Sequence, residues 1–220
     1  GTENIVFNAG TYTSTGNLSA CSCSVTGATV TIASGHTLTL VNGLTVSSGS
    51  MTFNNSASLI QINDITNTGN IVYRRNTAMK RYDYTYWSSP VSPQTLANLS
   101  PLTLSDKYFW WNPAAGIYNW ATVTAPALTS MTQGQGYIIR APQFLPDLVT
   151  PWPTTSEPFV GSFSGVPNNG DYTVSIVKSA SGDFNLIGNP YPSAIDADAF
   201  ITGNAATFTN GTLGTTLYFW

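Results

Sequence analysis

Short segments in which apolar and polar residues alternate recur through the first third of the chain. Each is too short for a helix, and Gly, Asn or Ser separates nearly every neighbouring pair. A spacing of roughly seven or eight residues suits the successive faces of a parallel β-solenoid. The pattern therefore predicts a short solenoid over residues 1–75, built from TVTIA (Thr29), TLTLV (Thr37), LTVSS (Leu44), MTF (Met51), SLIQI (Ser58) and IVYRR (Ile71).

The alternation also assigns the two sides of each solenoid strand, because successive side chains of a strand point to opposite faces. The residues expected inside are Val30, Ile32, Leu38, Leu40, Leu44, Val46, Met51 and Phe53. The residues expected outside are Thr29, Thr31, Thr37, Thr39 and Thr45. An outward Thr-x-Thr array is one feature of ice-binding faces, but threonine also suits solvent-facing strand positions through its branched Cβ.

The remaining residues, 76–220, are typical of antiparallel β-structure. Short strand-like runs alternate with turns rich in Gly, Pro and Asn, which favours a β-sandwich or a jelly roll. Because the sequence stops inside the strand-like run TLYFW, we expect this domain to continue beyond residue 220. The expected strands include RYDYTYWSS, KYFWW, IYNWATV, GYIIRA, PFVGSF, DYTVSIVK, FNLIG, ATFTNG and TLYFW.

Two short helical turns are expected among these strands. SPQTLANL has Ser92 as a candidate N-cap and Pro93 in its first turn. Ser193 and Asp196 have the spacing of a capping box. Asp196 and Asp198 are alternatively candidate calcium ligands, although calcium takes about six to eight oxygens and two carboxylates supply few of them.

Charge is scarce and unevenly distributed. Only 8% of the residues are charged, the net charge is −3, and Lys and Arg are absent until Arg74 and Arg75, where we place the boundary between the two halves. A basic surface is what nucleic acids require, so we expect no nucleic-acid partner. We expect no membrane span either, because no apolar run approaches the about 18 residues that a spanning helix needs.

The candidate chemistry is weak. Cys21, Cys23 and His36 supply at most three zinc ligands, and two small buried thiols are the alternative interpretation. His36 is the one histidine and has no acid nearby in sequence, which favours a turn residue over a catalytic base. A glycosidase would need two carboxylates across a cleft, which the ten acids of the chain leave open. We expect a protein that is not an enzyme and has no metal or cofactor.

Aromatic residues gather in one stretch, KYFWWNPAAGIYNW, which predicts a hairpin with rings on both faces. One face should pack on the core. The other could form a platform on which the C–H faces of sugars stack, or it could be covered by another part of the protein. The candidate platform residues are Trp110, Trp111, Tyr118 and Trp120.

The phrases YWSSPV and GNPYPSAID, with QGYIIRAP and GTLYFW, resemble large secreted surface proteins that the Bacteroidota type IX secretion system exports. The similarity covers residues 57–220. It implies a secreted or cell-surface, adhesin-like module without catalytic activity. If the aromatic hairpin is a platform, the partner expected for it is a surface polysaccharide or glycan. The similarity also implies contact with the secretion machinery through a C-terminal sorting domain that this sequence does not contain.

Overall fold

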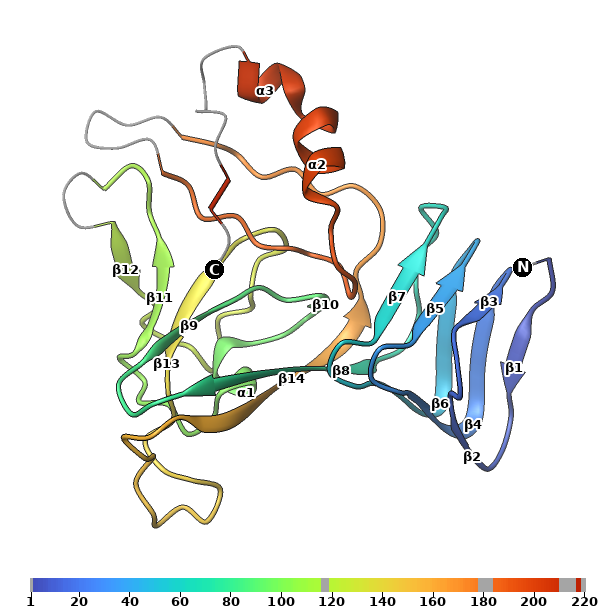
Figure 1. Cartoon of the computed structure of the whole chain (residues 1–220), viewed down its shortest axis with the longest axis horizontal. Coiled ribbons are helices and arrows are strands. Elements are labelled where there is room, and N and C mark those ends of the chain that lie inside the picture. Colours follow the sequence, from blue (N-terminus) through green and yellow to red (C-terminus); the bar gives the residue numbers. More distant parts are fainter. Residues whose placement is uncertain (1, 116–118, 178–183, 210–216, 219–220) are drawn as a thin grey trace.

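A computed structural model describes residues 2–115, 119–177, 184–209 and 217–218. The described residues are mostly β, with a solenoid-like region followed by antiparallel sheets. The solenoid coils lie on one side of the molecule and a four-stranded sheet on the other, with β8 (Ile71–Met79) and β14 (Glu157–Pro167) between them (Figure 1). The predicted all-β fold class is thus confirmed as far as a solenoid-like region followed by antiparallel sheets.

The solenoid consists of two sheets of parallel strands joined coil by coil. A three-stranded sheet has the order β3-β5-β7, and the opposite strands belong to a seven-stranded sheet with the order β1-β4-β6-β8-β14-β10, in which β2 also pairs with β4. Residues one coil apart are partners, as in Val30 with Met51 and Leu38 with Leu59. The strands are β1 (Ile5–Phe7), β2 (Thr11–Thr13), β3 (Leu18–Ala20), β4 (Cys23–Ile32), β5 (Thr37–Leu40), β6 (Leu44–Phe53), β7 (Ser58–Gln61) and β8 (Ile71–Met79).

The predicted inward residues of these strands form the solenoid core. Seven of the eight are fully buried, and Val46 is partly buried and packs against the others. Stacked coils place Ile32 beside Phe53 and Phe53 beside Tyr73, and the last two rings lie 6.3 Å apart. Burying such a stack removes apolar surface from water, which is the main force that holds successive coils together.

The strand β8 joins the solenoid to the rest of the chain. On one edge it pairs in parallel with β6, and on the other it pairs antiparallel with β14 (Glu157–Pro167) over nine residues. Arg74 and Arg75, where the sequence places a domain boundary, lie inside this strand, so one sheet runs across that position. The buried core is also continuous, because Phe163 of β14 belongs to the same cluster as Phe53.

A four-stranded antiparallel sheet with the order β12-β11-β13-β9 forms the far side of the molecule. Its strands are β9 (Tyr84–Trp87), β11 (Tyr108–Trp111), β12 (Trp120–Thr122) and β13 (Tyr137–Arg140), while β10 (Val91–Ser92) pairs with β14. The segments 171–177 and 184–188 were expected to be strands, but they contain only an isolated bridge between Ile187 and Gln135. Most of TLYFW lies outside the described residues.

The helices differ from expectation in where they begin. Helix α1 (Leu96–Leu99) has Thr95 as its N-cap, not Ser92, and Ser92–Pro93 is a cis peptide bond before it. Helix α2 (Ala197–Gly203) has Asp196 as its N-cap, so Ser193 does not cap it. The ATFTNG strand was wrong, because Ala205–Thr209 forms helix α3. In each case the local pattern was only a few residues long.

Gly10 and Gly69 both have a positive φ, but only Gly69 is also closely packed. Gly69 (φ 82°) lies against the backbone of the preceding coil, and a Cβ there would collide with the carbonyl oxygen of Val46. Gly10 (φ 77°) has the same backbone conformation, but a Cβ there would have no atom within 4 Å. The substitution of each by Ala therefore adds the same left-handed strain but a different amount of steric conflict.

We expect Gly10→Ala to lower the free energy of unfolding by about 1–2 kcal/mol, the usual cost of a left-handed conformation for a residue with a Cβ. We expect Gly69→Ala to cost about 1–3 kcal/mol more, because the backbone of β6 must move. Urea unfolding followed by circular dichroism measures both values. Equal losses in the two variants would contradict the close approach at Gly69.

Candidate functional site

The outer face of the four-stranded sheet carries a patch of aromatic side chains, which we call the aromatic face. Cross-strand partners share a face, so the pairing of Phe109 with Ile138, and of Ile138 with Tyr86, places these three together. Trp111 pairs with Trp120 on the same face, and Tyr84 with Arg140. Strand β13 therefore aligns rings from two segments that lie more than twenty residues apart in sequence.

The rings of the aromatic face contact one another and remain partly accessible. Trp111 and Trp120 meet edge to face with centroids 5.0 Å apart, and Trp120 lies 6.1 Å from Tyr86. Tyr84 and Phe109 form a second edge-to-face pair at 5.8 Å. Such pairs hold each other in position, so the patch keeps its shape without a ligand.

The predicted platform residues do not all lie on one face of the sheet. Trp111 and Trp120 lie on the aromatic face, and Trp111 Nε1 also donates a hydrogen bond to the Phe184 carbonyl at 2.8 Å. Trp110 points the other way and packs against the core, beside Tyr137. Tyr118 lies outside the described residues. Sequence reasoning missed Tyr84, Tyr86 and Phe109, whose alternation was visible but whose pairing across β13 was not.

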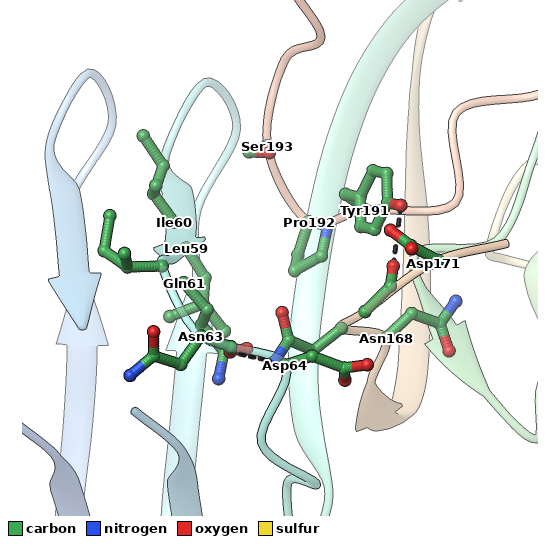
Figure 2. A pocket seen from close by; sticks show the side chains of 13 residues that line it. Leu59, Ile60, Gln61, Asn63, Asp64, Asn168, Asp171, Tyr191, Pro192 and Ser193 are labelled. Atoms are coloured by element: carbon green, nitrogen blue, oxygen red, sulfur yellow. Dashed lines mark hydrogen bonds between the residues drawn. The ribbon is translucent and has the colours of Figure 1, made fainter. Parts of the chain in front are cut away.

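A cavity of about 310 Å³ opens where the solenoid meets the C-terminal segments (Figure 2). Its walls come from three places: β7 and the residues after it, the segment that follows β14, and the GNPYPS turn. The lining residues are Leu59, Ile60, Gln61, Ile62, Asn63, Asp64, Asn168, Asn169, Gly170, Asp171, Tyr191, Pro192 and Ser193. A volume of this size lies at the lower end of small-molecule sites.

Hydrogen bonds between distant segments hold this cavity in shape. Leu59 N donates to the Pro192 carbonyl at 2.8 Å, which attaches the turn to the edge of β7. Asn169 Nδ2 donates to the carbonyls of Asn63 and Ile65 at 2.9 and 3.0 Å. Tyr191 Oη donates to the Gly170 carbonyl at 2.7 Å (Figure 2). The walls are therefore tied to each other and not only to their own strands.

The electrostatics of the cavity are negative. Asp64 and Asp171 line it, and neither carboxylate accepts a hydrogen bond from the described residues. Burial raises the pKa of the Tyr191 hydroxyl above its usual value, and the charges of Asp171 and Asp64 raise it further. Burial likewise raises the pKa of Tyr172, whose ring meets that of Tyr191 at 5.8 Å, with a smaller contribution from Asp64. The two carboxylates thus lie near the same pair of rings.

The candidate metal ligands of the sequence, which include Cys21, Cys23 and His36, line neither the aromatic face nor the cavity. The structure does not bring Cys21, Cys23 and His36 together, and the described part of the chain holds no group of three or more His, Cys, Asp or Glu side chains suited to a metal ion. His36 Nδ1 is instead hydrogen-bonded to Ser14 Oγ at 2.8 Å. Asp196 Oδ1 accepts from Ala199 N at 2.8 Å, which is the role of a helix cap.

The two thiols differ in environment, and their reactivity should differ accordingly. Cys23 is buried, and burial raises its pKa to about 12, so it stays protonated near neutral pH. Cys21 is partly exposed, and Asn42 Nδ2 donates to its sulfur at 3.2 Å. Because the thiolate is the reactive form, the exposed thiol is the one that a reagent can modify in the folded protein.

We therefore expect one thiol to react with Ellman's reagent at about pH 8 in the folded protein, and two after unfolding. Cys21→Ser should abolish the reaction of the folded protein, and Cys23→Ser should leave it unchanged.

The raised pKa of Cys23 also implies that its contribution to stability is fully present below about pH 9 and is lost as the pH rises towards 12, because only the unfolded thiol ionises in that range. Fast modification of Cys23 in the folded Cys21→Ser variant would contradict its burial.

Comparison with known proteins adds one match. A family model described as a domain of unknown function (DUF8693) matches residues 5–220, which include the solenoid, the aromatic face and the cavity. No curated protein matches the chain, and no solved structure does. In the described residues no helix combines the length and the apolar character needed to cross a membrane.

Proposed function

We propose that this chain, which belongs to the DUF8693 family of domains of unknown function, is a non-enzymatic module of a larger secreted protein at the cell surface. Its role would be structural and adhesive. The observation that carries the proposal is β8, which pairs with the solenoid on one edge and with β14 on the other. A module joined in this way can transmit force from one end to the other without a hinge, which suits a part that projects or anchors a longer protein.

The surface chemistry and the two sequence phrases support the same proposal. A surface with few charges dissolves through hydroxyls and amides and gives charged partners little to hold. The phrases YWSSPV and GNPYPSAID resemble type IX secretion cargo, so we propose export by that system. The proposed contact with the secretion machinery would go through a sorting domain in another part of the full protein.

We also propose that the antiparallel half is arranged as a sandwich with a jelly-roll-like topology. The inner face of the four-stranded sheet carries Trp87, whose ring lies 5.9 Å from Phe163 and 5.9 Å from Phe159, both on β14. Two sheets whose inner side chains meet in this way support a two-layer arrangement.

Labelling of intact cells tests the surface location. We expect antibodies raised against residues 1–220 to label intact wild-type cells of the producing bacterium, because a secreted module is accessible from outside. A strain without a functional type IX translocon should lose this surface label and retain the antigen inside. An antibody against a cytoplasmic protein controls for cell lysis. Antigen that remains inside intact wild-type cells would overturn the proposal.

The aromatic face favours a second candidate function, the binding of glycans. Trp111, Trp120 and Tyr86 form a connected and partly exposed set of rings. Pyranose sugars stack their C–H faces on such rings, and stacking needs no charge. The same face could instead be covered by another part of the full protein.

A glycan array distinguishes these two uses of the aromatic face. If it binds glycan, a Trp111→Ala, Trp120→Ala double variant should lose about tenfold or more in affinity, since each ring contributes about 0.5–1.5 kcal/mol. Trp110→Phe is the matched control, because its side chain lies on the opposite face and its substitution should leave binding unchanged. Circular dichroism verifies that both variants fold. Equal binding by the double variant and the wild type would exclude the aromatic face as the glycan site.

A further inference from the structure

A second cavity of about 250 Å³ adjoins the first, and the two share Tyr191 and Ser193 in their walls. The second cavity is lined mainly by the two phrases that the sequence singles out. YWSSPV supplies Tyr86, Trp87, Ser88 and Pro90, and GNPYPSAID supplies Asn189, Tyr191 and Ser193. The remaining lining residues are Tyr73, Arg75 and Phe163. The phrases lie about a hundred residues apart, so the fold alone brings them to one place.

The contact between the two phrases is specific. Ser88 Oγ donates to the Asn189 carbonyl at 2.8 Å. The buried Asn168 side chain donates to the carbonyls of Ser89 and Pro190, at 3.2 and 2.9 Å, and so bridges both phrases. Asn189 closes its own turn by accepting from Tyr191 N at 2.9 Å. The cavity walls are thus set before any ligand arrives, which lowers the cost of binding.

We propose that the two cavities form one groove, here called the junction groove, which binds a neutral saccharide chain. Sugars present apolar C–H faces and many hydroxyls, so a site for them needs both apolar surface and hydrogen-bonding groups. The apolar residues that line the first cavity include Ile60 and Ile62, which are 41% and 65% exposed. Asp64 and Asp171 supply carboxylates that accept from hydroxyls.

The second cavity has the same two kinds of surface. Trp87 supplies aromatic carbon, and Ser88 and Ser193 are polar residues of the same wall. Tyr191, shared by both cavities, has its hydroxyl fixed on the Gly170 carbonyl and so presents a ring of fixed position. A chain of sugar units laid along the groove would meet apolar and polar groups in each cavity in turn.

Charge selects neutral sugars over acidic ones. Asp64 and Asp171 repel uronic acids and sulfated sugars. The basic side chain lining the groove, Arg75, is already engaged: Nη2 donates to the Ala57 carbonyl at 2.7 Å, Nη1 donates to the Asn54 carbonyl at 3.3 Å, and the guanidinium covers the Tyr73 ring at 3.9 Å. It therefore offers little to an anionic ligand.

Binding fits the groove better than hydrolysis does. A glycosidase acid must hold its proton at neutral pH, which enzymes achieve by burying the carboxyl group. Asp64 and Asp171 are exposed side chains at the mouth of the first cavity. This inference is independent of the proposed surface location and does not require the aromatic face to bind glycan, although Tyr86 lies at the border of both surfaces.

Isothermal titration calorimetry tests the junction groove with a panel of neutral hexasaccharides that differ in linkage, and with hexagalacturonate as the acidic counterpart. We expect at least one neutral hexasaccharide to bind and hexagalacturonate to bind more weakly. An Asp64→Asn, Asp171→Asn double variant should lose about tenfold in affinity, because neutral amides accept weaker hydrogen bonds than carboxylates. Ser193→Trp, which places a bulky ring at a residue that lines both cavities, should lose binding as well.

A Glu3→Gln, Asp106→Asn double variant is the matched control, because it removes the same charge from exposed positions outside the groove. It should bind like the wild type. The Trp111→Ala, Trp120→Ala variant should also retain binding, which separates this site from the aromatic face. Circular dichroism verifies the fold of each variant.

Several results would overturn the proposal. These are no binding by any neutral hexasaccharide, unchanged binding by the Asp64→Asn, Asp171→Asn variant, or tighter binding of hexagalacturonate. Loss of all binding in the Trp111→Ala, Trp120→Ala variant would place the ligand on the aromatic face. Saturable binding of calcium chloride alone that the Asp64→Asn, Asp171→Asn variant abolishes would make the groove a cation site, and release of shorter saccharides would make it an enzyme.

Discussion

The two-sided pairing of β8 is the constraint on which the rest of the structure depends. A parallel solenoid sheet ends on this strand, and an antiparallel sheet begins on it. The chain direction therefore reverses between β8 and β14, while the hydrogen-bond ladder continues without a break. The shorter solenoid sheet has no such continuation, because the position beside β7 is taken by the turn at Pro192. The junction groove lies where one sheet stops and the other goes on.

Buried amides hold this junction together through hydrogen bonds. Asn67 Oδ1 accepts from Leu44 N and Gln61 Nε2, at 2.8 and 2.9 Å, while its Nδ2 donates to Gln61 Oε1 and the Pro167 carbonyl, at 2.7 and 2.9 Å. An amide buried without partners would destabilise the fold, whereas a fully bonded one fixes a single arrangement of the groups around it. Asn168 has the same role on the other side of the groove.

Sequence was informative where structure repeats locally and uninformative where distant segments meet. The inward positions from Val30 to Phe53 followed from alternation alone, because each coil buries the same face. The division of the hairpin, with Trp110 inside and Trp111 outside, depended on which face of β11 meets the core, and alternation leaves that choice open. The phrases YWSSPV and GNPYPSAID stood out in the sequence, but the groove that they line did not, since its walls come from segments about a hundred residues apart. Asp64 and Asp171 are both exposed acids in connecting segments, and only the fold makes them neighbours of Tyr191.

Because the solenoid is built coil by coil, the length of the module can change without a change in the surfaces at its other end. Each coil contacts only its neighbours, as the pairing of β5 with β3 and β7 shows. Coils added at the β1–β3 end would change how far the module reaches but would leave β7, β8 and everything beyond them untouched. Reach can therefore vary among related chains by gain or loss of coils, while the aromatic face and the junction groove at the other end stay the same.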